Sequence, residues 1–308
     1  MTFLLRQVTR VLARLSTGLL IGLLGAPPLI ADVRFVHQAV SDEMFLGTKE
    51  AEWTFSYLPA ALYVEKETRF TGSWMKRFFG KEKLERVATA FLMDQDQIRE
   101  TDWQNRRIYV FDLEKMDRLQ WIKDKRESFA AVSEHLKNRY QVKEPQLSIE
   151  IVPGEVALAG HACQRVLARL RLETVDRLKQ ASSITLVDQE LWLSRHVPGY
   201  DVYLAFHSGL AGRLGIEAQR LGPLTYLLRY WSEPLTSIQD TLSRLQGYPV
   251  RSSITVTAQY VTGIDTDAPR TLEKRLKTET VQLSAISQAL IDTDRFKDPD
   301  QFEIIHPE

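Results

Sequence analysis

The sequence predicts an α+β protein that is built mainly on antiparallel β-strands. Two stretches, residues 165–173 and 253–260, alternate apolar and polar side chains, as a strand with one solvent-facing side does. Helical patterns are few and fall between the strands instead of alternating regularly with them, unlike a doubly wound parallel sheet. The sequence has no fixed-period repeat and no long Pro/Gly/Ser linker, so residues 32–308 are expected to form a single domain, with its core at about 52–303.

The two clearest strands predict which side chains face the core. Their apolar positions are Val166, Ala168, Leu170 and Leu172 in the first, and Ile254, Val256, Ala258 and Tyr260 in the second. Turn-like pairs such as Gln104-Asn105 between weaker strand patterns favour hairpins in a meander. The weaker patterns cover residues 52–57, 61–70, 86–93, 97–102, 106–113, 146–152, 183–193 and 277–286.

Three segments carry helical patterns. Ser128 is a suitable N-cap for a helix whose apolar face holds Phe129, Val132, Leu136 and Tyr140. A second helix is expected at about residues 235–245, after Pro234. The apolar, glycine-containing segment 200–214 is a third candidate.

The first 31 residues have the pattern of an export signal. Arg6, Arg10 and Arg14 precede a short apolar run, and a small-residue segment ends at Ala31. The run is shorter than the about 20 residues of a membrane-spanning helix, and Pro27 and Pro28 interrupt the segment that follows it. We therefore expect cleavage near Ala31 and a periplasmic or otherwise extracytoplasmic location. The alternative is a signal that is kept as an N-terminal anchor.

Charge and cysteine content narrow the function classes. The chain has 40 basic and 40 acidic residues, so removing three arginines leaves 37 against 40, a net charge of −3. This balance is against nucleic acid as a partner. Cys163 is the only cysteine, so an internal disulfide is excluded, and burial of its thiol is expected.

Several segments resemble an uncharacterised family of exported bacterial proteins, over about residues 52–303. They are the hairpin segment beginning Asn105-Arg-Arg-Ile-Tyr-Val-Phe-Asp, the strand start Gly160-His-Ala-Cys, the Trp-bearing Gln189-Glu-Leu-Trp-Leu-Ser-Arg-His-Val-Pro-Gly199, the turn Gly247-Tyr-Pro-Val250 and the tail Arg295-Phe-Lys-Asp-Pro299. This family is similar in architecture to the periplasmic lipoprotein carrier and to lipid-sensing periplasmic domains. The resemblance implies a curved antiparallel sheet, or half-barrel, with a few helices packed on its concave side. It transfers no catalytic residue.

The sequence was compared with known catalytic, metal-binding and cofactor-binding motifs, and it matches none of them. No two of the six histidines have zinc-ligand spacing, and Ser208 lacks the first glycine of a nucleophile elbow. The acidic tail 292–303 fails as a calcium loop, because Phe296 and Lys297 occupy positions that need a ligand and a glycine. We therefore predict no catalytic, metal or cofactor site.

Two groups of aromatic residues are candidates for binding. Phe111, Trp121, Trp192 and Trp231 are predicted to line a hydrophobic groove, although aromatic side chains at such positions also serve as plain core. Residues 65–86 mix basic and aromatic side chains and are a candidate membrane or partner loop, whose aromatics alternatively pack locally. The loop residues singled out are Trp74, Lys76, Arg77, Phe78 and Phe79.

The sequence thus favours a non-enzymatic extracytoplasmic protein that binds a hydrophobic ligand between sheet and helices. A lipid or a lipoprotein acyl chain is the expected partner, since each buried methylene contributes about 0.8 kcal/mol without special polar groups. One alternative is a structural or interaction protein of the cell envelope with a protein partner. The other is an unrecognised hydrolase that uses Ser208 or His207.

Overall fold

The computed structural model describes residues 32–44, 47–72, 84–113, 139–214, 244–264, 266 and 268–307. All of them belong to the compact unit Asp32–Glu308. The proposed signal, residues 1–31, lies outside the described residues, so cleavage near Ala31 stays a prediction.

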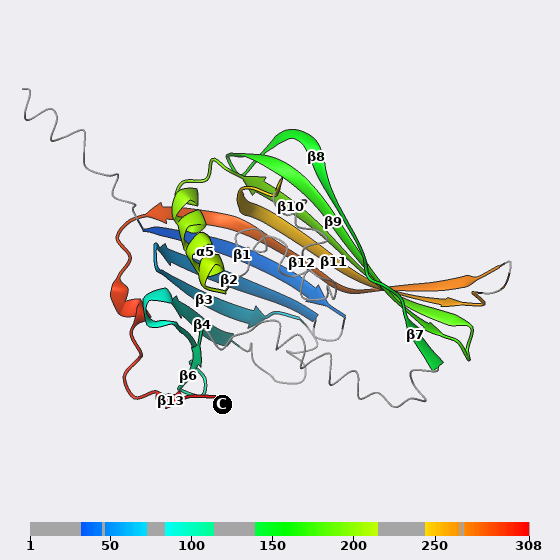
Figure 1. Ribbon diagram of the computed structural model, residues 1–308, viewed down its shortest axis with the longest axis horizontal. Helices are drawn as coiled ribbons and strands as arrows, with labels where there is room; N and C mark the ends of the chain where they lie inside the picture. Colours follow the sequence, from blue (N-terminus) through cyan, green and yellow to red (C-terminus); the bar gives the residue numbers. More distant parts are fainter. Residues whose placement is uncertain are drawn as a thin grey trace, which may run out of the picture. The chain divides into compact units, whose positions relative to one another are not determined.

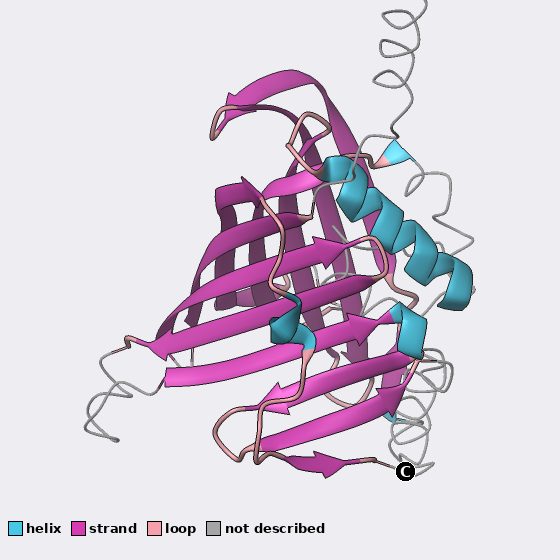
Figure 2. Ribbon diagram, turned by 90° about the vertical axis from the view of Figure 1, so that its left-hand side faces the viewer, coloured by secondary structure: helices cyan, strands magenta, loops and turns pink. Residues whose placement is uncertain are grey.

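Strands dominate the described residues, and they form one curved, unclosed sheet (Figures 1 and 2). The strands are β1 (Val33–Glu43), β2 (Gly47–Leu58), β3 (Ala61–Phe70), β4 (Leu84–Leu92), β5 (Gln97–Asp102), β6 (Arg107–Asp112), β7 (Tyr140–Val142), β8 (Gln146–Leu158), β9 (His161–Asp176), β10 (Ala181–Ser194), β11 (Tyr248–Thr262), β12 (Arg270–Gln288) and β13 (Glu303–Ile305). The spatial order is β13-β6-β5-β4-β3-β2-β1-β12-β11-β10-β9-β7, and β8 also pairs with β9. All pairings are antiparallel except that of β13 with β6, which is parallel.

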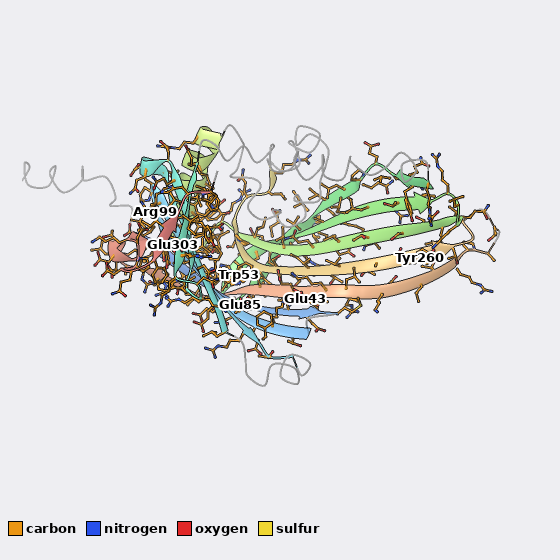
Figure 3. All side chains as sticks on the ribbon, turned by 90° about the horizontal axis from the view of Figure 1, so that it is seen from below. Glu43, Trp53, Glu85, Arg99, Tyr260 and Glu303 are labelled. Atoms are coloured by element: carbon orange, nitrogen blue, oxygen red, sulfur yellow. The ribbon has the colours of Figure 1, made fainter. Side chains whose placement is uncertain are left out.

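The predicted strand segments are confirmed, because each of the ten lies in a strand of this sheet apart from the end residues Met93, Arg106 and Leu113. In β9, Val166, Ala168 and Leu170 are all buried, as the alternation predicts. The pattern weakens in β11, where Ile254 is buried but Tyr260 is 41% exposed. Tyr260 lies toward the far end of the long strands, as Figure 3 shows.

β1 is a central strand that the sequence patterns did not indicate. It joins the two halves of the sheet by pairing with β2 on one side and β12 on the other. Its inward positions are Val33, Phe35, His37, Ala39 and Ser41, all buried. Since a histidine and a serine occupy two of these positions, the apolar alternation fades halfway along the strand.

The helix α5 (Tyr200–Leu214) confirms one of the three helical predictions and covers part of one sheet face. Val202, Tyr203, Phe206 and Leu210 are its buried residues; Phe206 follows the first two by four and three residues, and Leu210 follows Phe206 by four. They form the main core cluster with inward side chains such as Phe35 and Tyr57. The short 3-10 helices are η1 (Met93–Gln95) and η4 (Thr293–Phe296).

The other two helical predictions fall mostly on residues 129–138 and 235–243, which lie outside the described residues. Tyr140, predicted on a helical face, lies instead in β7 and pairs with Asp176. The predicted helix is wrong at this residue, because the Tyr-Gln-Val segment suits a strand and adds to the edge of β9. Leu245, at the end of the other predicted helix, is buried in a second apolar cluster.

This second cluster lies on the same sheet face as α5, across β8 to β11. Its buried members include Val166 and Leu170 of β9, Val187 and Leu191 of β10, and Ile254 of β11. In cross-strand register, Val166 faces Leu191, and Leu170 faces Val187, so these side chains share one face. The opposite face carries ion pairs, including Arg169 with Asp188 and Arg165 with Glu190.

Candidate functional site

Two of the nine residues predicted to bind a ligand or partner lie in the described part of the chain. Phe111 on β6 and Trp192 on β10 are half-buried and pack against the core cluster that contains α5. The Arg165 guanidinium lies over the Trp192 ring, 5.5 Å from the centroid of that ring. In sheet order, β6 and β10 are separated by seven strands. The remaining seven predictions lie outside the described residues: Trp121, Trp231, Trp74, Lys76, Arg77, Phe78 and Phe79.

The sheet face under α5 is a packed aromatic core. Phe35 stacks on Tyr248 with ring centroids 4.0 Å apart, and Tyr57 meets Tyr203 edge to face at 5.5 Å. His37 Nε2 lies 2.7 Å from the Tyr248 hydroxyl, and burial lowers the pKa of His37 to about 4. A neutral imidazole is therefore built into this core.

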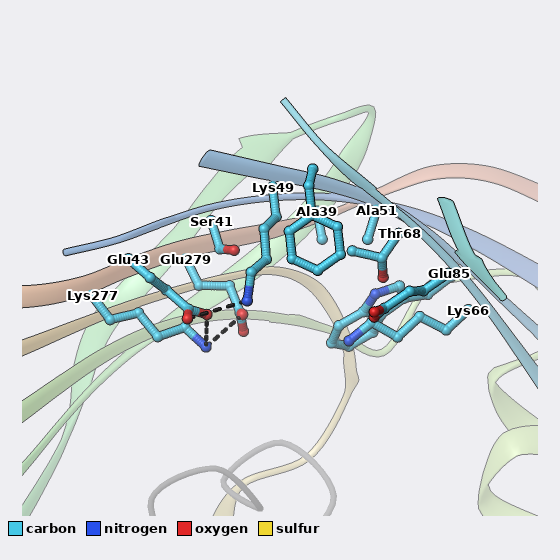
Figure 4. Close-up of a pocket in the computed structure, with 12 residues that line it drawn as sticks. Ala39, Ser41, Glu43, Lys49, Ala51, Lys66, Thr68, Glu85, Lys277 and Glu279 are labelled. Atoms are coloured by element: carbon cyan, nitrogen blue, oxygen red, sulfur yellow. Dashed lines mark ion pairs between the residues drawn. The ribbon is translucent and has the colours of Figure 1, made fainter. Parts of the chain in front are cut away.

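A polar pocket of about 160 Å³ opens on the same face, beyond the aromatic core (Figure 4). Five adjacent strands supply its lining, which is Ala39, Ser41 and Glu43 of β1, Lys49, Ala51 and Trp53 of β2, Lys66, Thr68 and Phe70 of β3, Glu85 of β4, and Lys277 and Glu279 of β12. We call these twelve residues the polar pocket.

Cross-strand register explains the hollow at its centre. One row of directly opposed residues runs Ala39, Ala51 and Thr68, ending at Glu85. The neighbouring row holds Ser41, opposed to Lys49. Directly opposed residues point to the same sheet face, so a floor of small side chains is surrounded by long ones. The small residues leave the space, and the long ones form its rim.

Ion pairs join part of the rim. Glu43 lies 3.2 Å from Lys49 and 3.8 Å from Lys277, and Lys277 lies 2.9 Å from Glu279. Figure 4 shows these contacts as dashed lines on one side of the pocket. The four side chains are only 16–24% exposed. Partly burying charged groups has a free-energy cost that their mutual attraction offsets.

Lys66 is held differently from the other two lysines. Its ammonium lies 4.8 Å from the ring centroid of Trp53, and it makes no ion pair with any residue that the structure describes. Burial is the main cause that lowers the pKa of Lys66; Glu279 and Glu85 act against it, whereas Lys277 and Lys49 reinforce it. Lys66 is exposed to solvent, and its neighbours on this face are the Trp53 ring and Glu85, which lies diagonally across from it on β4.

Within the described part of the chain, Trp53 carries a hydrogen-bond donor without a partner. Its indole Nε1 is buried and has no hydrogen-bond acceptor among the described residues. Trp53 and Lys66 are directly opposed on β2 and β3, so both belong to the same part of the pocket wall. A buried donor without an acceptor costs about 1–3 kcal/mol, which an incoming acceptor would recover.

Sequence reasoning missed the polar pocket. Lys66 was counted within the basic segment 65–86, but residues 65–70 lie in β3 and residues 84–86 in β4. The sequence signal that could have indicated the pocket is the presence of charged residues, such as Glu43, Lys49 and Lys277, at inward strand positions. Their meeting depends on the pairing of β12 with β1, two strands more than 200 residues apart in the chain.

The tested catalytic and metal motifs have other roles where the structure describes them. His207 Nε2 lies 3.3 Å from the Tyr57 hydroxyl, whereas Ser208 is exposed, and adjacent helix residues do not face each other. In the acidic tail, Asp298 pairs with Arg99 and Phe296 packs on Tyr63. Within the described ranges, no group of three or more His, Cys, Asp or Glu residues is arranged to hold a metal ion.

Cys163 is buried, as predicted. Burial raises the pKa of its thiol, and Glu155 acts in the same direction. A thiol with a raised pKa is a poor nucleophile. Among the helices of the described residues, none is long and apolar enough to cross a membrane.

No protein-family model matches the chain, and no curated protein matches its sequence.

Proposed function

We propose that this protein is a non-enzymatic, extracytoplasmic binder of a hydrophobic ligand such as a lipid or an acyl chain. The proposal treats the sheet as a half-barrel whose concave side is the face that carries α5 and the polar pocket. One observation carries it: this single face passes from the aromatic core, through the polar pocket, to the apolar cluster of β8–β11.

Register supports continuity between pocket and apolar cluster. Glu279 and Lys277, on the β12 side of the pocket, are directly opposed to Ile254 and Val256 of β11. Ile254 belongs to the apolar cluster, and Val256 packs against it while remaining partly exposed. A ligand with a polar end and an apolar end would thus find both surfaces on adjacent strands.

The volume of the pocket indicates that the polar pocket and the apolar cluster would hold different parts of the ligand. At about 160 Å³, the pocket is well below the about 300–1,000 Å³ of typical small-molecule sites. It suits a headgroup and is too small for a whole lipid. The acyl chain would lie along the apolar part of the face, where each methylene removed from water contributes about 0.8 kcal/mol.

Filling the pocket tests this function. Ala51 lies on the pocket floor, so Ala51→Leu should reduce binding of an added monolauroylglycerol at least ten-fold in calorimetric titration. Ala285→Leu, at an exposed position of β12 opposed to Val36 on the other sheet face, is the matched control and should bind as the wild type does. Organic extracts of the purified protein should contain lipid. Extracts without lipid, together with a melting temperature that added lipids do not change, would show the proposal to be wrong.

A second candidate function, an interaction role in the cell envelope, has an observation in its favour. Val142, Tyr260 and Leu272 are 75%, 41% and 71% exposed. Register places them in one row across β7, β9, β10, β11 and β12, so three large apolar side chains lie on one exposed face.

Site-specific crosslinking tests this role. A photoreactive residue at Leu272 should link to one envelope protein in stoichiometric yield, and the same residue at Leu290, which is 94% exposed, should not. Equal crosslinking at both positions would reject the role. A hydrolase role has no comparable support, given the separation of His207 and Ser208 on α5.

The proposed location is periplasmic or otherwise extracytoplasmic, after cleavage near Ala31. A fold that reaches stability without an internal disulfide is compatible with this compartment, because its buried clusters supply the packing.

A further inference from the structure

β8 is an edge strand of the sheet. Among the described residues, it pairs with β9 and with no other strand, and no backbone group outside β9 hydrogen-bonds to it. Figure 1 shows β8 along the margin of the sheet beside β9. The described sheet therefore leaves the N–H and C=O groups on one side of β8 open to a further strand.

The first part of β8, residues 146–152, lacks the usual protection of an edge strand. Pro145 and Pro153 bound this segment, and it contains no lysine, arginine or proline. Its only charged residue is Glu150, and its register with β9 is regular as far as Ile151. Natural edge strands avoid pairing by means of cations, prolines, bulges or short length. A segment of seven residues without these features is a site for strand pairing.

The inward side chains of the segment would gain burial from a further strand. Leu147, Ile149 and Ile151 are only half-buried, although they pack against the apolar cluster of β8–β11. The intervening positions are exposed and hold Gln146, Ser148 and Glu150. An added strand with the same alternation would cover the apolar set and leave the polar set in water.

The segment is complementary to itself. Paired antiparallel with a second copy about Ile149, it opposes Leu147 to Ile151 and Ser148 to Glu150. Apolar residues then face apolar residues, the Ser148 hydroxyl donates to the Glu150 carboxylate, and no like charges are opposed. This register is centred between the two bounding prolines, so every residue of the segment takes part. A register centred on Glu150 would instead oppose two carboxylates.

We propose that residues 146–152 pair with the same residues of a second copy of this chain, antiparallel about Ile149, and so join two sheets into a dimer. Such a contact is closed by two-fold symmetry, unlike a head-to-tail contact that grows into a fibre. The two apolar clusters of β8–β11 would adjoin on one face of the joined sheet. The pairing itself does not rest on the proposed ligand.

Charge changes at Ser148 test the partner and the register. Ser148→Glu would set two pairs of opposed carboxylates between the copies, so the association constant in sedimentation equilibrium should fall about ten-fold. Ser148→Lys would set an ammonium against Glu150, so the dimer should be at least as tight as that of the wild type. Within one chain Ser148 faces Arg169, so Ser148→Glu should melt no lower than Ser148→Lys, the opposite order to dimerisation.

Ser287→Glu is the matched control. Ser287 is also an exposed serine that faces an arginine, Arg34, but it lies on β12, which has a strand on each side. This variant should dimerise as the wild type does.

A disulfide locates the two-fold axis. Directly opposed residues of antiparallel strands have Cα atoms about 4.5–5.5 Å apart, within the range that a disulfide spans. Ile149→Cys should therefore give, on mild oxidation, a dimer that denaturing electrophoresis separates only after reduction. Val142→Cys, on β7 and 75% exposed, should give no such dimer.

Three outcomes would overturn the proposal. One is a wild type that stays monomeric up to about 0.1 mM. Another is a dimer that Ser148→Glu leaves unchanged, because the contact would then lie elsewhere. The third is a monomer whose Ile149→Cys variant forms its disulfide with a different envelope protein, because the occupant of the edge would then not be a second copy.

Discussion

His37 is a titratable side chain held inside the aromatic core. It is 5% exposed, its Nε2 lies 2.7 Å from the Tyr248 hydroxyl, and Phe55 meets its ring edge to face at 5.5 Å. Burial lowers the pKa of the folded-state imidazole from 6.5 to about 4. Between these values the unfolded chain binds a proton that the folded protein does not.

Stability should therefore depend on pH through His37. Its contribution is fully present above pH 6.5 and is lost as pH falls toward 4, by at most about 3 kcal/mol. Urea unfolding at pH 7.0 and 4.5 should show a larger drop for the wild type than for His37→Gln, which cannot be protonated. His306→Gln, at an exposed position near the C-terminus, should retain the wild-type drop. Equal drops for wild type and His37→Gln would contradict this assignment.

Glu173 is the clearest example of a carboxylate held by several donors. Burial would raise its pKa, but hydrogen bonds from Lys143, Arg171 and Ser182 prevail and lower the pKa to about 2. Lys143 follows β7, while Arg171 and Glu173 lie on β9 and Ser182 on β10. One side chain thus ties the segment after β7 to the next two strands of the sheet.

Removing this charge should loosen the contact. Glu173→Gln is expected to lower the free energy of unfolding by about 1–2 kcal/mol at pH 7, below the 3–5 kcal/mol of a fully buried pair, since Lys143 is half exposed. The difference in unfolding free energy between the wild type and Glu173→Gln should have its full size above pH 4.5 and disappear as pH falls toward 2. Denaturant titration measures both, and Glu150→Gln, at an exposed position of β8, should change stability by less than about 0.5 kcal/mol. No loss in Glu173→Gln at pH 7 would refute the role of this cluster.

At the scale of elements, α5 is the main cover of the aromatic core. Phe206 is fully buried and contacts Tyr57 and Phe91 from different strands. Phe206→Ala should therefore cost about 3–5 kcal/mol in chemical denaturation, the usual range for a buried phenylalanine. Ser208→Ala, two residues further on and exposed, should be nearly neutral. A loss below about 1 kcal/mol for Phe206→Ala would mean that α5 does not cover this core.

The strands were predictable wherever one face of the sheet is apolar. β9 keeps Val166, Ala168 and Leu170 inward, so periodicity alone located it. Periodicity did not predict β1, because the polar residues His37 and Ser41 occupy inward positions of this strand. Hydrogen bonding of His37 and the polar pocket around Ser41 allow polar side chains there. β7 and β13 have three residues each, too few for a pattern, and they are held by pairing with long-range partners.

At the scale of the whole sheet, the polar pocket could not be derived from any one segment. Its floor and rim come from residues 39–85 and from Lys277 and Glu279, which meet only because β12 pairs with β1. Local periodicity gives the inward direction of each side chain but not the identity of the strand beside it. The sequence predicted a groove lined by aromatic residues 111, 121, 192 and 231; the polar pocket is lined mostly by charged and small side chains, together with Trp53 and Phe70.

The unclosed sheet also gives the proposed carrier its geometry. A closed barrel of this size would surround its ligand, whereas an open face lets a headgroup and a chain enter from the side. Glu43, Trp53 and Glu85 mark the pocket near the middle of the sheet in Figure 3, away from the far ends of the strands. Ligand exchange would then need no opening of the strand ladder.

Native mass spectrometry of the protein recovered after export from cells carrying the full-length gene tests the central claim most directly. The account predicts a chain that begins at or near residue 32 and carries one lipid per chain, whose fragments contain an acyl chain. A chain with no adduct, to which monolauroylglycerol also fails to add in a one-to-one complex, would contradict it.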